Sequence, residues 1–170
     1  MLDGFVIINR VKITFIKKKI LGGRLTMMMP ETFEPRHRYE VEKRYLTKEH
    51  PEMAYSQYGD RSHSLLLCDT RLPCVNENIL VLTPLVDDKL PLDFIKVNSQ
   101  DASLTEMKII ESFDRNVAYF DFICSLYNLI FFFSLDDKLV CGKLSCYKFG
   151  NLERRKPVLM QMLGSISDVE

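Results

Sequence analysis

Residues 128–149 read NLIFFFSLDDKLVCGKLSCYKF. Residues of high β-propensity fill 129–133 and recur through 139–149, and Asp136 and Asp137 lie between the two runs. Adjacent aspartates suit a tight turn, because they tolerate its backbone angles and hydrogen-bond to their own backbone. The stretch therefore predicts two antiparallel strands joined as a hairpin.

A second segment repeats this design. Residues 85–90 read LVDDKL and residues 134–139 read SLDDKL, and each run follows an apolar segment opened by asparagine, at Asn78 or at Asn128. We therefore expect a second hairpin within 78–97. Paired aspartates can also bind Mg²⁺ or serve acid–base chemistry. Because a lysine follows each pair at a hairpin tip, we assign both pairs to turns.

Two helices are indicated. Ser103 and Glu106 have the spacing of a capping box, in which each side chain binds a backbone amide of the other residue. The helix predicted over 103–113 would turn its apolar residues to the core at helical spacing. Those residues are Leu104, Met107, Ile110 and Phe113. A second helix is predicted from about Pro157, which suits a first helical turn, to Ile166.

The order of the elements resembles that of a known fold. From about residue 64 the chain reads three strands, a helix, two strands and a helix, which is similar to the five-stranded barrel of the OB-fold. Some OB subunits of single-strand-binding complexes carry a C-terminal helix for assembly, so the resemblance implies that role for the last helix. We expect an α+β fold, a small, mainly antiparallel β-barrel or sheet with one helix between hairpins and a C-terminal helix.

The composition suits one domain. The chain has 170 residues, 46% hydrophobic and 27% charged, and its 23 basic and 23 acidic side chains balance, so no polyanion partner is favoured overall. We expect 1–26 to be a basic N-terminal extension outside the domain, 27–60 a charged arm, and 61–170 the single globular domain. The extension could also be a mitochondrial presequence, or precede a translation start near Met27, while the alternation over 11–15 fits a strand.

The cysteines and the N-terminus indicate the compartment. An odd number of cysteines at irregular spacing argues against a secreted disulfide framework, and Asn9, Arg10 and Lys12 interrupt the only N-terminal apolar stretch. We expect an intracellular protein of the nucleus or cytoplasm. Residues 117–135 are apolar enough to suggest a membrane span, but Asp121 and an acidic flank favour buried strands, so no membrane contact is expected.

No catalytic residue, metal site or cofactor is predicted. Cys141 and Cys146 are spaced more widely than the usual zinc-binding pair. On one strand their odd separation directs them to opposite faces, so that they cannot share an ion. The run 60–64 contains serine and histidine but lacks the G-x-S-x-G nucleophile elbow. The sequence thus favours a protein that is not an enzyme.

Protein contact is the favoured role. The runs 78–83 and 129–133 are apolar on both faces, whereas a small barrel covers only one face of a strand. The last helix contains methionine, which adapts to binding grooves. We predict an interaction subunit of a larger, nucleic-acid-associated complex. Its partner-binding residues would be Phe131, Phe133, Leu159, Met162, Leu163 and Ile166.

Direct binding of single-stranded DNA or RNA by an OB-like protein is the alternative. Basic and aromatic residues interleave near the C-terminus, as on surfaces that hold phosphates and stack bases. Strand alternation would expose Lys143 and Ser145 together. The nucleic-acid-binding residues in this alternative are Lys143, Tyr147, Phe149, Arg154 and Arg155.

Overall fold

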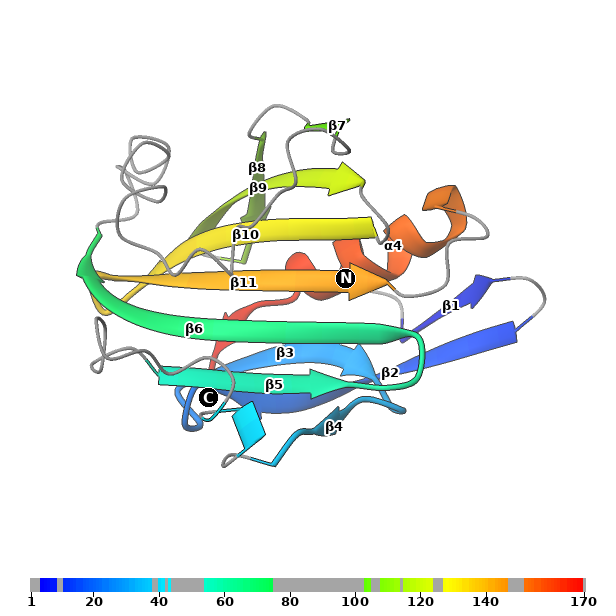
Figure 1. Cartoon of the computed structure of the whole chain (residues 1–170), viewed down its shortest axis with the longest axis horizontal. Helices are drawn as coiled ribbons and strands as arrows, with labels where there is room; N and C mark the ends of the chain where they lie inside the picture. Colours follow the sequence, from blue (N-terminus) through cyan, green and yellow to red (C-terminus); the bar gives the residue numbers. More distant parts are fainter. Residues whose placement is uncertain are drawn as a thin grey trace.

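Two antiparallel sheets and the helix α4 form the main elements of the part of the chain that the structure describes (Figure 1). The structure is a computed structural model. It describes residues 4–8, 11–37, 40–41, 43, 54–74, 103–104, 108–113, 115–123, 127–146 and 152–169.

The larger sheet has eight strands in the order β4-β5-β6-β11-β10-β9-β7, and β8 also pairs with β9. The hairpin of β10 and β11 lies at its centre, and β6 continues the pairing on the β11 side. The strands are β4 (Glu34–Pro35), β5 (Ala54–Gly59), β6 (His63–Pro73), β7 (Ser103–Leu104), β8 (Lys108–Ser112), β9 (Arg115–Ile123), β10 (Tyr127–Leu135) and β11 (Lys138–Cys146).

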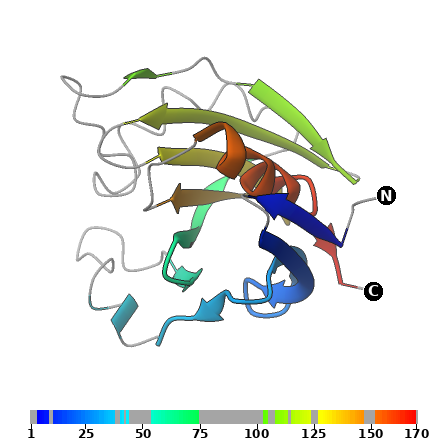
Figure 2. The same ribbon diagram turned by 90° about the vertical axis from the view of Figure 1, so that its right-hand side faces the viewer.

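The smaller sheet joins the two ends of the chain. Its order is β1-β2-β3-β12, and Ser167 of β12 pairs with Thr26 of β3. Its strands are β1 (Phe5–Ile8), β2 (Val11–Ile20), β3 (Leu25–Pro30) and β12 (Ser167–Asp168). The helix α4 (Leu152–Leu163) lies on the same side of the larger sheet as this smaller sheet, as Figure 1 and Figure 2 show from two directions.

The hairpin predicted at 128–149 is confirmed over 128–146, and residues 147–149 lie outside the described part of the chain. Asp136 and Asp137 join β10 to β11, and their φ angles of 52° and 59° are those of a two-residue turn whose twist matches the strands. The similar segment 85–90 lies outside the described residues. Within the apolar stretch 117–135, whose first ten residues fit a strand or a helix by periodicity, residues 117–123 belong to β9 and residues 127–135 form β10. No helix in the described segments is long and apolar enough to cross a membrane.

The expected OB-like barrel is wrong. Within the described segments, the larger sheet ends at β4 on one side and at β7 and β8 on the other, and no pairing joins these edges. A barrel needs such closure. The second layer, formed by the smaller sheet and α4, covers one face of the larger sheet instead. Residues 5–30, which the sequence pattern assigned to an extension and an arm, form strands β1, β2 and β3. These strands cover a face of the larger sheet, and this is the physical reason why the sheet does not close on itself.

The helix expected between the hairpins is also wrong. Ser103 and Leu104 form β7, and Lys108–Ser112 form β8, which pairs with β9. A capping box stabilises a helix by only about 1 kcal/mol, so pairing with a neighbouring strand can override it. The C-terminal helix is confirmed, but it begins at Leu152 and ends at Leu163, and Pro157 lies inside it.

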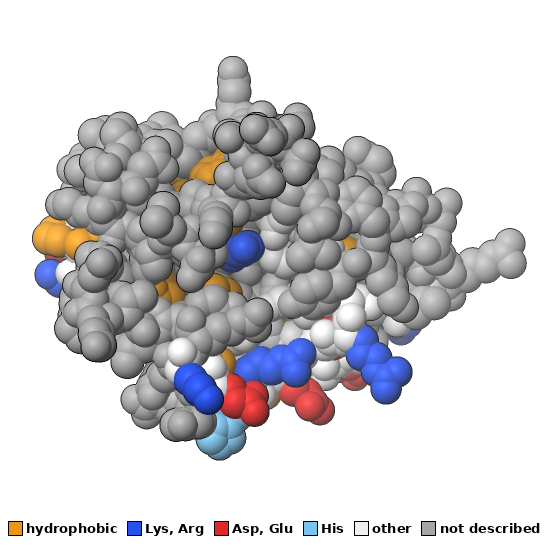
Figure 3. Space-filling view, viewed as in Figure 1, with side chains coloured by type: hydrophobic (Ala, Val, Ile, Leu, Met, Phe, Trp, Pro, Cys, Tyr) orange, Lys and Arg blue, Asp and Glu red, His pale blue; other side chains and the backbone are white. Residues whose placement is uncertain are grey.

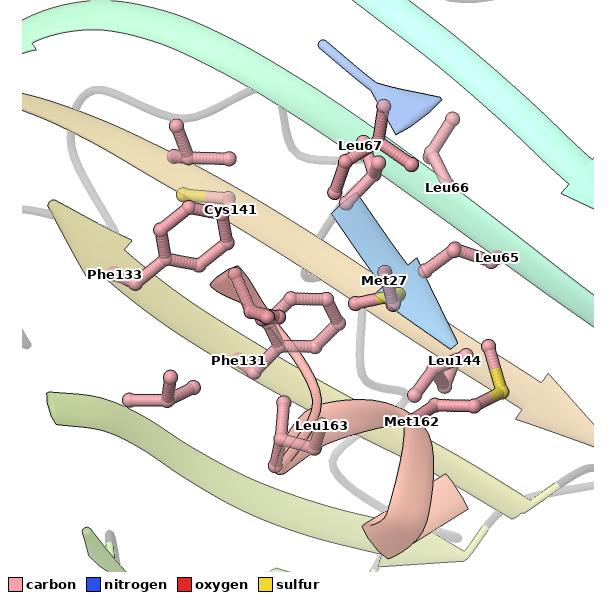
Figure 4. Packing of buried hydrophobic residues seen from close by; sticks show 14 of the residues in the cluster. Met27, Leu65, Leu66, Leu67, Phe131, Phe133, Cys141, Leu144, Met162 and Leu163 are labelled. Carbon is pink, nitrogen blue, oxygen red and sulfur yellow. The ribbon is translucent and has the colours of Figure 1, made fainter. Parts of the chain in front are cut away.

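The core between the layers centres on Phe131. Its ring lies over Gly142, its partner in the β10–β11 ladder, where a Cβ would overlap with the ring. Met27, Leu144 and Met162 come from different elements and lie on one side of the Phe131 ring (Figure 4). All of these apolar side chains are buried. The absence of a side chain at 142 therefore lets an aromatic ring fill the space between sheet and second layer.

Two arginines tie the smaller sheet to the larger one. The Arg24 guanidinium lies 2.6 Å from the Asp69 carboxylate, which is buried on β6. Arg115 on β9 lies 2.6 Å from Asp168 on β12 and donates a hydrogen bond to the carbonyl oxygen of Ser134. Because a carboxylate with few water contacts needs a charged partner, the pair at Asp69 fixes where the β2–β3 turn sits.

Replacing Gly142 with alanine should destabilise the fold. We expect G142A to lower the free energy of unfolding by about 2 kcal/mol or more, because overpacking a core displaces neighbouring groups. Gly4→Ala is the matched control, since a Cβ there meets no atom within 4 Å. Urea unfolding followed by circular dichroism measures both. Equal stability of G142A and the parent chain would contradict the packing at Phe131.

Candidate functional site

The residues predicted to bind a partner are all in the core. Phe131 and Phe133 come from β10, Leu159, Met162 and Leu163 from α4, and Ile166 from the segment that follows, and each is 0% exposed. Figure 4 shows Phe131, Met162 and Leu163 packed between the layers. These side chains stabilise the sandwich and are closed to a partner while the layers stay packed.

Of the residues of the nucleic-acid alternative, the described segments place the side chain of Lys143 alone. Lys143 is half-buried on β11, beside Leu66 of β6. Ser145 is 7% exposed and donates a hydrogen bond to Asn128, so the expectation that it is exposed beside Lys143 is wrong. Tyr147 and Phe149, and the side chains of Arg154 and Arg155, lie outside the described part of the chain.

The β1–β2 hairpin carries an exposed apolar group. Phe5 is 44% exposed, Ile7 64% and Ile16 39%. The hairpin projects past the ends of β5 and β6 in Figure 1, and Figure 2 looks onto this end of the molecule. Single exposed apolar residues are ordinary, but three on one projecting hairpin form a patch that suits binding. Residues 1–26 were expected to lie outside the domain, so sequence reasoning did not single this patch out.

Basic side chains accompany the patch. Lys12 lies over the Phe5 ring, with its Nζ 4.4 Å from the ring centroid, and Lys17 and Lys19 are exposed on the same hairpin. No aspartate or glutamate occurs between residues 4 and 30. By strand alternation Lys17 and Lys19 lie on the other face of β2, so we call Phe5, Ile7, Ile16 and Lys12 the hairpin surface. The excess of basic residues in this segment is the signal by which the sequence could have indicated the surface, because the charge of the whole chain is balanced.

A second exposed apolar group lies at the β8–β9 turn. Phe113 is 61% exposed and has φ 54°, a left-handed conformation that is rare for a bulky residue. Ile109 on β8 is 45% exposed. The neighbouring Ser112 donates a hydrogen bond to the carbonyl oxygen of Ile166, which holds this turn against the segment before β12. The two apolar groups therefore lie toward opposite edges of the smaller sheet.

A cavity of about 580 Å³ lies beside β4 and β5, lined among others by Arg36 and Asp60. Charged side chains of both signs gather there, along the lower edge in Figure 3. The Asp60 carboxylate accepts hydrogen bonds from Thr32 and from the backbone of Ser62 and His63, and lies 3.2 Å from His63 Nδ1. Its acceptor sites are thus occupied by the protein, and the carboxylate orders the β5–β6 turn.

These contacts shift the pKa of Asp60. Burial by itself would raise it, but the hydrogen bonds from His63, Thr32 and Ser62 outweigh burial and hold the pKa of Asp60 well below its ordinary value of 3.8. A folded-state pKa below the unfolded value stabilises the fold above that unfolded value. The stabilisation is lost as the pH falls from 3.8 through the lower folded-state pKa.

We therefore expect Asp60 to contribute to the loss of folding stability at low pH. The free energy of unfolding of the parent chain should decrease below about pH 4, and Asp60→Asn should flatten this decrease and lower stability at neutral pH. Glu31→Gln removes one exposed carboxylate nearby and serves as the control. Urea unfolding between pH 2 and pH 7 is the measurement. A pH profile of Asp60→Asn parallel to that of the parent chain would exclude this role.

The thiols of Cys68, Cys74, Cys141 and Cys146 are buried, and no group of three histidine, cysteine or acidic residues in the described segments could hold a metal ion. Cys68 and Cys141 face each other across β6 and β11, whereas Cys146 pairs with His63, so the predicted separation of Cys141 and Cys146 onto opposite faces is confirmed. Burial raises the pKa of Cys68 to about 12 and the pKa of Cys141 well above its usual range. Both thiols are therefore protonated at neutral pH and poor nucleophiles.

Alkylation of Cys68 and Cys141 should require the chain to unfold. We expect iodoacetamide to modify these two residues at least about tenfold more slowly in the native chain than in urea, because only the exposed thiolate reacts. Peptide mapping by mass spectrometry reads each site separately, and reduced glutathione labelled in the same mixture controls for reagent activity. Equal native and denatured rates at Cys68 would contradict its burial.

Solved structures show what this fold is similar to. The solution structure of cyanobacterial PsbP (CyanoP) from Synechocystis sp. PCC 6803 matches with a TM-score of 0.57 and 11% sequence identity, covering 91% of this chain and 92% of that one. The crystal structure of the Saccharomyces cerevisiae Ran-binding protein Mog1p matches with a TM-score of 0.48 and 10% identity, covering 93% and 97%. No family model and no curated protein matches the sequence.

These likenesses concern the fold. At 11% identity the match to CyanoP extends over nearly the whole of both chains, so it supports a PsbP-like sandwich of sheets in place of the OB-like barrel. Fold similarity carries no function by itself, because unrelated functions share folds. The role of this chain must be argued from its own surface.

Proposed function

We propose that this chain is a non-enzymatic subunit that acts by binding another protein. The observation that carries the proposal is the hairpin surface, where Phe5, Ile7 and Ile16 are exposed together at a projecting end of the fold. Burying apolar area contributes roughly 25 cal/mol per Å², so a partner that covers these side chains gains stability.

The exposed turn at Phe113 supports the same role. A phenylalanine in a left-handed conformation stores strain, and such strain persists where the surrounding structure and function demand it. Its ring projects into solvent instead of filling the core. An association of the resulting complex with nucleic acid stays a prediction from the sequence.

The proposal can be tested in the cells that produce the protein. We expect the tagged chain to purify at a mass well above its own 19.9 kDa, with chemical crosslinks to another protein at Lys12, Lys17 or Lys19. Replacing Phe5, Ile7 and Phe113 together with serine should reduce the complexed fraction at least about tenfold, because apolar anchors dominate binding energy. Light scattering and crosslinking mass spectrometry are the measurements.

Lys138→Ser is the control, since it changes an exposed residue that belongs to neither apolar group. Circular dichroism establishes that each variant is folded. A chain that purifies at its own mass, without crosslinks, would refute the proposal. So would a serine variant whose complex is as abundant as that of the parent chain.

A further inference from the structure

Cys68 and Cys141 lie directly opposite each other on neighbouring strands. They are partners in the ladder of β6 and β11, and the irregularity of that ladder is confined to Lys138 and Val140. Paired residues of antiparallel strands direct their side chains to the same face of the sheet. Both cysteines are 0% exposed, and both thiols are free. Two thiols from distant parts of the sequence therefore share one place in the larger sheet.

The backbone hydrogen bonds indicate how far apart the two residues are. The Asp60 amide donates to the carbonyl oxygen of His63 at 3.0 Å, so the backbone groups of His63 point from β6 toward β5. Because this direction alternates along a strand, the backbone groups of Cys68 point toward β11. Cys68 and Cys141 thus form a hydrogen-bonded pair, and the Cα atoms of such a pair lie about 5.5 Å apart. Disulfide-bonded cysteines most often have a Cα separation of about 5.5–6 Å.

The other described cysteines are placed differently. Cys146 is opposite His63 in the same ladder, and its odd separation from Cys141 directs these two side chains to opposite faces. Cys74 follows the last residue of β6, and its amide donates to the carbonyl oxygen of Asp137. Among the described cysteines, Cys68 and Cys141 are therefore the pair that strand register holds together.

Aromatic residues flank the two thiols along the same row of the sheet. Tyr55 of β5 pairs with Cys68, and Phe132 of β10 pairs with Cys141. Both aromatic side chains are buried. Thiol–disulfide exchange requires a thiolate to reach a sulfur atom, so a bond between these two sulfurs would be closed to reductants while the strands stay paired. The same burial keeps an oxidant from the thiols of the folded chain, so the bond has to form while the chain folds.

We propose that Cys68 and Cys141 form a disulfide when the chain folds in the presence of oxidised glutathione, and that the folded sheet protects this bond from reduction. In the unfolded chain, the thiolate of one cysteine attacks the oxidant, forms a mixed disulfide and releases one glutathione thiolate. As β6 pairs with β11, the thiolate of the other cysteine attacks the first cysteine's sulfur and releases the second glutathione. Two thiols are oxidised to one disulfide, and one oxidised glutathione is reduced to two glutathione thiols, which take up the two protons.

This bond makes the stability of the larger sheet depend on the redox conditions of folding. It ties β6 to the β10–β11 hairpin through one covalent link and restricts the unfolded chain, which is how a disulfide stabilises a fold. A single bond is compatible with the odd number of cysteines, because that number argues only against a framework in which every cysteine is paired.

The test compares oxidation of the chain during folding with oxidation of the unfolded chain. The full chain is refolded from urea in a mixture of oxidised and reduced glutathione, alkylated, and digested without reductant, and mass spectrometry identifies the cross-linked peptides. We expect the bond between Cys68 and Cys141 to exceed every other pairing at least about tenfold after refolding. Oxidation in urea is the control, because loop closure in an unfolded chain favours near neighbours such as Cys68 and Cys74.

Variants relate the bond to stability. The urea midpoint of the oxidised parent chain should exceed that of the reduced chain by about 1 M, and Cys141→Ser should abolish this difference. Cys146→Ser is the matched control on the same strand and should leave both the bond and the difference unchanged. If Cys141→Ser fails to fold, peptide mapping of the parent chain decides by itself.

Three results would overturn the inference. They are a predominance of bonds from Cys74 to Cys68 or to Cys141 after refolding, recovery of the native circular dichroism spectrum with no bond between Cys68 and Cys141, and removal of the bond from the folded chain by reduced glutathione. Partner binding is measured separately by the serine variants of the exposed apolar residues, so the proposed function stands or falls independently of this bond.

Discussion

The contact between the Phe131 ring and Gly142 is the constraint on which the sandwich depends. It lies in the β10–β11 ladder at the centre of the larger sheet, and a side chain at 142 would occupy the space of the ring. Because the ring fills that space, the surface on which β3 and α4 pack is continuously apolar. The Asp136–Asp137 turn sets the register that brings the two residues opposite each other.

The second layer explains how the chain assigns its apolar residues. Phe131 and Met162 are apolar enough to suggest binding residues, but both are buried between the larger sheet and the helix. Among the apolar residues that remain exposed, Phe5, Ile7 and Ile16 belong to the hairpin of β1 and β2, where the smaller sheet extends beyond the larger one (Figure 1), and Ile109 and Phe113 belong to β8 and its turn. At the hairpin, exposure follows from the unequal extent of the two layers and not from hydrophobicity along the chain.

The ionic links show how the ends of the chain are held. Arg24 reaches Asp69 from the β2–β3 turn, and Arg115 reaches Asp168 next to the C-terminus. Both pairs join the smaller sheet to the larger one across a long separation in sequence. Such pairs contribute little at a free surface, but the burial of Asp69 makes its partner necessary. These pairs therefore hold the smaller sheet, with the β1–β2 hairpin that carries the exposed patch, against the larger sheet.

The sequence by itself determined the elements that local chemistry controls. The Asp-Asp turn, the strands on its two sides, the C-terminal helix and the opposite faces of Cys141 and Cys146 all follow from short-range patterns. Only the tertiary structure decided that 108–112 is a strand, that the described strands of the larger sheet form an open sheet, and that Phe5 and Ile7 are exposed while Phe131 is buried. Those outcomes depend on pairing and burial between residues far apart in the sequence, for which neither propensity nor periodicity carries information.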